Sequence, residues 1–356
     1  MYASERENMG LRGFIIKRII NSLLLLVFVL VLNFIIFQLM PGNPIEMFAG
    51  AQRLKNKEQV EEVLKLWGFR DPIQVRFARY MYNMLTFQFG ISFVSQQYVI
   101  SEVGDRLTNT LILLGTEGIL SLIIGITLGV IAAKKRGSLF DNASVIVSLT
   151  TYSLPSFWMG MILILIFAYK LGWFPMAGAF PRDWATTYIT SGGLPPRIVL
   201  GTIMGTTIAL PSLLEISGRL LHLFLPVVTL TLFSYGGYLL LTRATMLETL
   251  TEDYVITARA KGLKERTVLF KHALKNASLP LITSAALSFG FILSGAIITE
   301  QVFSYPGLGM WTWRAISQND FPVLQAIFYL IGICVIVANF IADVLYGVVD
   351  PRIKYG

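Results

Sequence analysis

Long stretches without charged residues constrain this chain more than any other feature. A helix needs about 20 predominantly apolar residues to cross the hydrocarbon core of a bilayer. Six stretches are long enough, and a single carboxylate, that of Glu117, interrupts them. These stretches cover residues 19–45, 107–133, 142–169, 220–242, 276–299 and 321–342. The sequence therefore predicts an all-α polytopic membrane protein with six transmembrane helices.

The composition of the 356 residues excludes the main alternatives to a membrane protein. Hydrophobic residues make up 54% of the chain and charged residues 14%, whereas soluble domains carry roughly 25% charged residues. An apolar content this high also excludes a disordered chain, and a single cysteine excludes a disulfide scaffold. The net charge of +8 then needs a membrane explanation before a nucleic-acid one.

The apolar stretches divide the chain into alternating spans and connecting segments. A helical extracytoplasmic segment is expected between the first two spans, because residues 41–106 mix many aromatic residues with charges. Residues 198–210 are apolar but too short to cross, and we expect them to form a short interfacial or re-entrant helix. We place the spans at 19–40, 107–133, 143–169, 221–242, 280–299 and 322–345, and the segments at 1–18, 41–106, 170–219, 243–279, 300–321 and 346–356.

The distribution of Lys and Arg predicts the orientation. Short cytoplasmic segments of membrane proteins are enriched in these residues. More than half of the 29 Lys and Arg fall in the two termini and in the short stretches that follow the second and fourth spans. Both termini and the segment 243–279 are therefore expected in the cytoplasm.

The segment 252–276 has the pattern of two short amphipathic helices. Glu252 and Asp253 suit the N-terminus of the first helix, and Arg259 and Lys261 suit its C-terminus. Gly262 is a natural left-handed residue at which the chain can turn. Such a pair could rest on anionic headgroups or dock a cytoplasmic partner. A DNA-binding helix-turn-helix is not favoured, because the fifth span begins where the pair ends.

At this segment the chain resembles the permeases of ATP-binding-cassette importers, and more narrowly their dipeptide/oligopeptide/nickel family. The run DYVITARAKGLKERTVLFKHALKNASLP is similar to the family's EAA-type loop. Five further runs, in the family's order, extend the resemblance through nearly the whole chain. These are FIIKRIINSLLLLVFVLVLNFIIFQLMPGNP, WGFRDPIQVRFARYMYNMLTFQFGISF, GVIAAKKRGSLFDNASVIVSLTTYSLPSFWMG, EQVFSYPGLGMWTW and DVLYGVVDPRIKY.

The chain departs from the family pattern at three places. Ile256 stands where the generic loop has an acidic residue, six positions before Gly262. Thr108 and Asn109 stand in a tetrad that often reads Leu-Pro-x-Thr in the family. Residues 181–219 are longer than usual and have no counterpart in the family pattern.

The resemblance implies a fold, partners and a docking surface. The fold is that of a type I importer permease in a prokaryotic cell membrane. Its implied partners are a second homologous permease, two cytoplasmic ATPases, an extracytoplasmic solute-binding protein and the lipid bilayer, with no nucleic acid. The ATPase-docking residues it implies are Asp253, Thr257, Ala258, Arg259, Ala260, Lys261, Gly262, Leu263, Arg266 and His272.

The sequence predicts no catalysis by the chain itself. It has no G-x-x-x-x-G-K-[ST] loop that could cradle ATP phosphates, so ATP and Mg²⁺ belong to partner subunits. Its two histidines, His222 and His272, fall on opposite sides of the membrane, and with the single Cys334 they form no metal constellation. We therefore expect no resident cofactor or metal, and an intramembrane enzyme is not favoured.

Glu117 is the residue within a span that most needs an explanation. A carboxylate at a helix centre costs about 2.5–3.5 kcal/mol to insert, so it should face the bundle interior or a wet cavity. It could line the translocation pathway or serve as a hydrogen-bonded structural group. Gly125 and Gly129 form a G-x-x-x-G in the same span, which indicates close helix packing.

Three readings of the transport function remain open at this stage. The main one is an importer of peptides. The same architecture could import oligosaccharides or nickel, since the pore usually leaves selectivity to the binding protein. A stand-alone secondary transporter would need coupling-ion carboxylates at mid-membrane, and Glu117 is the one candidate.

Overall fold

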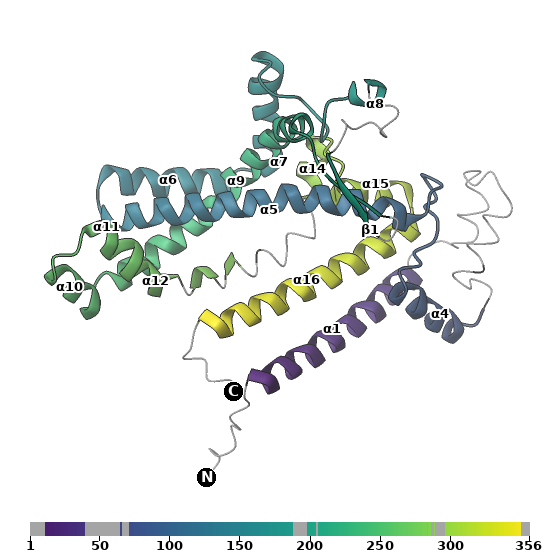
Figure 1. Cartoon of the computed structure of the whole chain (residues 1–356), viewed down its shortest axis with the longest axis horizontal. Helices are drawn as coiled ribbons and strands as arrows, with labels where there is room; N and C mark the ends of the chain where they lie inside the picture. The colour runs from purple at the N-terminus through teal and green to yellow at the C-terminus, as the bar shows by residue number, and fades with distance from the viewer. Residues whose placement is uncertain are drawn as a thin grey trace, which may run out of the picture. The chain divides into compact units, whose positions relative to one another are not determined.

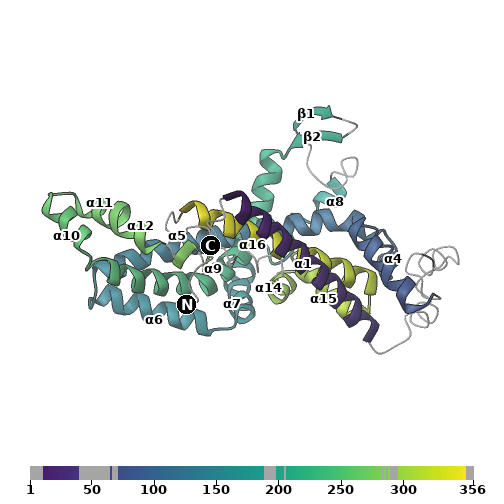
Figure 2. The same cartoon turned by 90° about the horizontal axis from the view of Figure 1, so that it is seen from below.

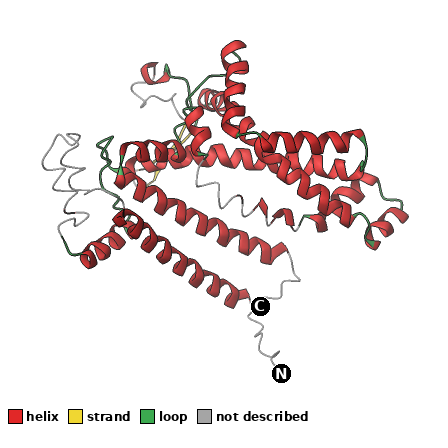
Figure 3. Cartoon of the chain, turned by 180° about the vertical axis from the view of Figure 1, so that it is seen from behind, coloured by secondary structure: helices red, strands yellow, loops and turns green. Residues whose placement is uncertain are grey.

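The computed structural model describes most of the chain, and in that part helices dominate (Figure 3). The chain forms two compact units. The first comprises Met1–Thr108, Ser278–Gly295 and Trp311–Gly356, and the second comprises Asn109–Ala277 and Ala296–Met310. The structure describes residues 11–39, 65, 71–187, 198–203, 206–278, several positions between 280 and 288, and 296–349.

Two long apolar helices lie side by side in the first unit. They are α1 (Leu11–Leu39) and α16 (Phe321–Val349), drawn in purple and yellow in Figure 1. A Cβ on Gly332 of α16 would lie 2.7 Å from Val29 of α1, so the missing side chain permits the close approach. The amide of Asn33 donates a hydrogen bond to the Gln325 carbonyl at 3.2 Å. The shorter helices α4 (Ile73–Leu85) and α15 (Leu308–Gln318) also contribute to this unit, with α15 starting in the second unit.

The second unit is built on three helices. These are α5 (Val99–Lys134), which begins in the first unit, α6 (Leu139–Ser153) and α9 (Leu213–Thr249). The backbone carbonyl of Ser148 in α6 would lie 2.8 Å from a Cβ on Gly236 of α9. Around them lie α7 (Ser156–Leu163), the π-helical η1 (Ile164–Lys170), α8 (Trp184–Thr187) and α14 (Ile297–Val302). After α9 come α10 (Asp253–Ala260), α11 (Glu265–Thr267), the π-helical η3 (Val268–Ala273) and α12 (Leu274–Ala277).

The predicted span 143–169 is not one continuous helix. It is a pair, Leu139–Ser153 and Ser156–Lys170, bent by 98°. Pro155 has no N–H to continue the helix, and its ring drives the preceding residue into the extended region. Leu154 accordingly has φ −80° and ψ 137°.

The predicted interfacial helix at 198–210 is also wrong. These residues form an antiparallel hairpin of β1 (Ile198–Ile203) and β2 (Thr206–Leu210), with an irregularity between Val199 and Gly201. The segment is rich in Ile, Val and Thr, whose branched Cβ atoms disfavour helix and favour strand. Apolar content alone, on which the prediction rested, does not separate the two states.

The described residues contain four helices long and apolar enough to cross a membrane, or five with the bent pair. Helices α5 and α9 are longer than the spans predicted at 107–133 and 221–242, because charged residues end an apolar run without ending a helix. Half of the predicted fifth span, 280–299, lies outside the described residues, as do residues 1–10, most of 41–70 and the tail from 350. The count of six stays a prediction.

Candidate functional site

The helix pair that follows α9 is the first candidate site, and it lies at one end of α5, α6 and α9 (Figure 2). Its first helix, α10, starts directly after Glu252. Gly262 has φ +73°, and its N–H donates to the Arg259 carbonyl at 2.9 Å. An added Cβ at Gly262 would meet nothing within 4 Å, so backbone conformation is what calls for glycine there. The prediction of two short helices turning at Gly262 is confirmed.

A buried apolar cluster holds this helix pair onto α5 and α9. Val255 from α10 and Val268 from η3 are both fully buried in it. Met246 from α9 is also fully buried, and α5 contributes Val130 and Ala133. We call this group the loop cluster: Val130, Ala133, Met246, Val255, Ala258, Val268, Leu269, Ala273 and Ala277. Because both ends of the pair contribute to it, the pair is fastened to the long helices along its length.

Most of the residues that the resemblance assigns to docking are exposed. Ala258 is the exception, since it is 6% exposed and packs inside the loop cluster. His272 is half-buried. The exposed ones are Asp253, Thr257, Arg259, Ala260, Lys261, Gly262, Leu263 and Arg266.

Three exposed apolar residues of the helix pair were missed by the sequence reasoning. Tyr254 is 37% exposed, Ile256 54% and Phe270 41%. Tyr254 and Ile256 flank the buried Val255, and Phe270 follows the buried Leu269, as helical periodicity allows. That periodicity was the signal that could have found them.

One ion pair bridges the two helices of the pair across the turn. Arg259 and Glu265 lie 3.0 Å apart, with side chains 43% and 37% exposed. An exposed pair of this kind contributes about 0–1 kcal/mol. The loop cluster, rather than the ion pair of Arg259 and Glu265, therefore holds the two helices together.

Glu117 lies in α5 and is buried, with 8% of its surface exposed. The hydroxyl of Ser121 donates to its carboxylate at 2.8 Å, and Ser234 of α9 provides a second hydrogen bond. The prediction that Glu117 faces the helix bundle is confirmed. The α5–α9 contact beside it is close, because a Cβ on Gly125 would lie 2.5 Å from that of Tyr238.

A second buried carboxylate, that of Glu300, was missed by the sequence reasoning. Glu300 is completely buried in α14. The hydroxyl of Thr110 donates to its Oε1 at 2.8 Å, and the N–H of Met310 donates to its Oε2 at 2.8 Å. The Thr110 Oγ in turn accepts the N–H of Leu308 at 2.7 Å. Burial raises the pKa of Glu300 to about 7.

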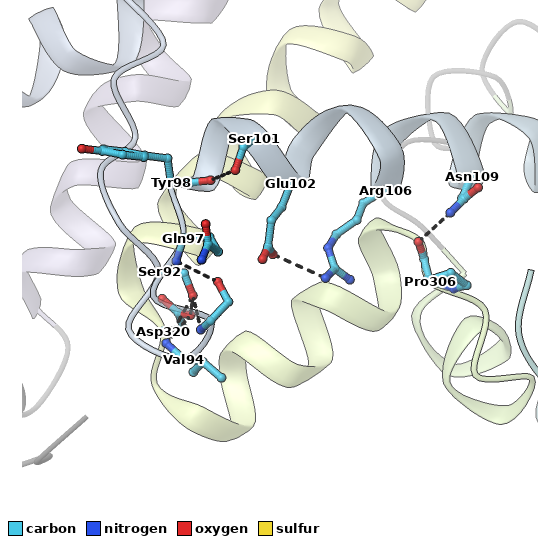
Figure 4. A network of polar contacts seen from close by, with 11 residues as sticks. Ser92, Val94, Gln97, Tyr98, Ser101, Glu102, Arg106, Asn109, Pro306 and Asp320 are labelled. Carbon is cyan, nitrogen blue, oxygen red and sulfur yellow. Dashed lines mark hydrogen bonds and ion pairs between the residues drawn. The ribbon is translucent and has the colours of Figure 1, made fainter. Parts of the chain in front are cut away.

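The two glycines of the Pro-Gly-Leu-Gly run permit this arrangement. A Cβ on Gly307 would collide with the Glu300 carboxylate and the Thr110 hydroxyl, and one on Gly309 would lie 2.8 Å from the Ile297 Cα. The amide of Asn109 also holds the run, since it donates to the Pro306 carbonyl at 3.0 Å (Figure 4). The motif is therefore a carboxylate-binding turn.

A comparable carboxylate lies within the first unit. Asp320 precedes α16 and accepts the Ser92 hydroxyl at 2.5 Å and the Phe93 N–H at 3.0 Å. Figure 4 shows the turn that contains Ser92 and Val94 gathered at this side chain. Burial raises the pKa of Asp320. It thus fixes the turn at 92–95 to the start of α16.

Metal ligands do not gather in the part of the chain that the structure describes. No group of three His, Cys, Asp or Glu side chains there could hold a metal ion. The expectation that the chain has no cofactor of its own stays a prediction.

Comparisons with known proteins agree with one another. Residues 125–355 match the profile of the family described as "Binding-protein-dependent transport system inner membrane component", and residues 11–114 match its N-terminal companion. The chain is similar to the "Oligopeptide transport system permease protein AppB" of Bacillus subtilis (strain 168), with 35% identity over 96% of this chain and 99% of that protein. It is also similar to the "Di/tripeptide transport system permease protein DppB" of Pseudomonas aeruginosa (strain UCBPP-PA14), with 37% identity over 92% and 94%.

A solved structure of the MetNI methionine ABC transporter in inward facing conformations is a more distant match. Its TM-score is 0.49 at 16% identity, and the match covers 70% of this chain and 97% of that chain. This likeness is too distant to inform the arrangement of the helices. The family profile spans most of the sequence, and both relatives are more than 30% identical along nearly their whole lengths. The chain therefore belongs to the family of binding-protein-dependent transport system inner membrane components.

Proposed function

We propose that this chain is a transmembrane permease subunit of an ATP-driven importer of peptides. The names of both relatives specify peptide transport, and their similarity extends over nearly the whole chain. A second homologous permease would complete the pathway, and a solute-binding protein would deliver peptides on the outer side. The chain would lie in a prokaryotic inner or plasma membrane with both termini in the cytoplasm.

The observation that carries the proposal is the helix pair after α9. It combines an outward surface of charged and apolar side chains with an inner surface buried in the loop cluster. A partner that moved the outer surface would therefore move the ends of α5 and α9. Two cytoplasmic ATPases, which use ATP and Mg²⁺, are the partners we propose there, with Gly262 as the turn between the docking helices.

Glu117 is the residue we propose for the translocation pathway. It is a carboxylate within a candidate span, and its hydrogen bonds to serines of α5 and α9 keep it at the contact of two long helices. Buried ionisable groups within spans are costly and commonly mark solute or ion routes.

Gly262→Asp tests the docking role. The change places a side chain at a positive φ and a negative charge on the exposed turn. We expect co-purification of the ATPases and peptide uptake into proteoliposomes to fall together, while the chain still inserts.

The matched control is Gly172→Asp. Gly172 also has a positive φ, +64°, and open space around its Cβ position, but it lies after η1, far along the chain from the helix pair. The control should keep both activities. If Gly262→Asp left association and transport intact, the docking assignment would fail.

A further inference from the structure

An ion pair with a buried carboxylate, that of Asp141 and Arg243, lies close to the helix pair. Asp141, in the first turn of α6, is 1% exposed. Its Oδ1 accepts the Nε of Arg243 at 2.5 Å, and its Oδ2 accepts the Nη2 at 2.9 Å. The N–H of Gly137, in the turn between α5 and α6, donates to the same Oδ2 at 2.9 Å. The Asp141 carboxylate thus joins three elements: the α5–α6 turn, α6 and α9.

The geometry of this pair fixes orientation as well as distance. A guanidinium that meets a carboxylate through two parallel N–H groups is held in one plane, which a single contact would not achieve. Ser138 fixes the other end, because its hydroxyl accepts the Asp141 N–H at 3.3 Å as the N-cap of α6. The start of α6 therefore cannot rotate relative to α9 without breaking the pair.

The ion pair of Asp141 and Arg243 lies next to the loop cluster in both of the segments that it joins. Arg243 precedes Met246, the α9 residue of the cluster, by three positions. Residues three positions apart are neighbours on the surface of a helix. On the other side, Ala133 of the cluster precedes the turn at 135–138 that Asp141 bonds. The helix ends to which the loop cluster is fastened are the ones that the ion pair clamps to α6.

We propose that Asp141 and Arg243 are positioning residues that transmit movement of the helix pair 252–277 to α6. This inference rests on the proposed docking of ATPases to that helix pair. The loop cluster contains residues of α5 and α9 but none of α6. A displacement of the docking helices therefore pulls directly on α5 and α9, and the clamp makes α6 follow. Farther along, α6 also packs against α9 at Ser148 and Gly236. Without the clamp, the start of α6 is therefore held less firmly, so it follows the ATP-driven movement less and uptake falls.

The test reads out movement in the complete transporter, with both permeases, both ATPases and the binding protein in proteoliposomes. In a Cys334→Ala background, an environment-sensitive fluorophore is attached at Leu139→Cys, since Leu139 at the start of α6 is 86% exposed. A second preparation carries it at Asn276→Cys, because Asn276 is an exposed residue of the helix pair outside the proposed docking residues. With the native pair, adding ATP should change the fluorescence at both positions.

Asp141→Asn should separate the two signals. We expect the ATP response at residue 276 to persist and the response at residue 139 to fall about tenfold, which is a typical size for a coupling between sites. Uptake of radiolabelled trialanine per ATP hydrolysed should fall with it. The charge swap Asp141→Arg with Arg243→Asp should recover part of both.

The chain offers a closely matched control. Glu215 and Arg219 form an ion pair at 3.0 Å with side chains 2% and 28% exposed, against 1% and 27% for the pair of Asp141 and Arg243. Both partners of the control pair belong to α9, four positions apart, so their ion pair links α9 to itself rather than to α6. Glu215→Gln should therefore leave the response at residue 139 unchanged, although it removes an equally buried charge.

Each outcome supports or overturns the role proposed for Asp141 and Arg243, or the docking of ATPases on which it rests. An unchanged response at residue 139 in assembled Asp141→Asn transporters would overturn the inference, as would an equal loss in Glu215→Gln. If Asp141→Asn did not assemble, Arg243→Lys, which keeps the charge but not the two-pronged contact, gives the same reading. An absent ATP response at both positions with the native pair would instead refute the proposed docking of ATPases.

Discussion

At the scale of single residues, the carboxylate of Glu300 hydrogen-bonds to groups that its neighbours in sequence do not indicate. Its hydrogen-bond partner Thr110 lies 190 positions away, and its remaining partners are backbone N–H groups of the turn that ends at Met310. A sequence reading finds the Gly-Leu-Gly run but cannot tell that a carboxylate fills the space beside it. Because Glu300 is completely buried, its carboxylate forms hydrogen bonds within the protein, and this run provides them.

The raised pKa of Glu300 predicts a pH dependence of stability. The folded value of about 7 lies above the ordinary value of 4.5, so between these pH values the folded state binds more protons than the unfolded one. The contribution to the free energy of unfolding is therefore fully present below pH 4.5 and is lost as the pH rises through 7. From pH 5 to pH 8 the loss should be on the order of 2–3 kcal/mol.

The measurement is thermal unfolding in detergent at both pH values, for the native chain and for Glu300→Gln. Glutamine keeps the shape of the side chain but does not titrate, so the variant should lose less stability than the native chain between pH 5 and pH 8. All other titrating groups cancel in the difference. Equal losses in the two proteins would mean that Glu300 does not titrate in this interval.

At the scale of elements, the contact between α5 and α9 depends on Gly125 and Gly129, at which the sequence predicted close helix packing. A Cβ on Gly129 would lie 2.6 Å from that of Thr242, and one on Gly125 would lie 2.7 Å from the Tyr235 carbonyl. We expect Gly125→Ala and Gly129→Ala each to reduce the free energy of unfolding by about 1–3 kcal/mol through overpacking.

The control for this prediction is Gly115→Ala in the same helix. An added Cβ there meets nothing within 4 Å, and alanine favours helix over glycine by about 1 kcal/mol. Its unfolding temperature in detergent should stay level or rise. Equal behaviour of the three variants would show that helix propensity, not helix contact, decides their stability.

At the scale of the whole molecule, the distribution of Lys and Arg predicts that the helix pair and the segment after η1 face opposite sides of the membrane. Lys261 and Met176 are exposed and represent the two. In a Cys334→Ala background, a membrane-impermeant maleimide should label Met176→Cys in intact cells. Lys261→Cys should react only after the membrane is opened. Labelling of both from outside would contradict the predicted orientation.

The sequence by itself determined the features that depend on neighbouring residues. Uncharged runs of membrane length identified the long helices, and the apolar pattern around Gly262 identified the helix pair and its turn. The break at Pro155 and the hairpin at 198–210 also have local signals, in proline geometry and in branched Cβ atoms. A reading based on apolar content alone overlooked both.

Only the tertiary structure decided which distant groups meet. Asp141 pairs with Arg243 across 102 positions, and Glu300 meets Thr110 across 190. Ala258 belongs to the family's motif yet is buried, while Tyr254 and Ile256 of the same helix are exposed. Hydrophobicity acts on each residue according to its own side chain, so it can be read along the chain. The choice of a partner for a buried charge depends on which helix faces packing brings together, and no run of adjacent residues contains that information.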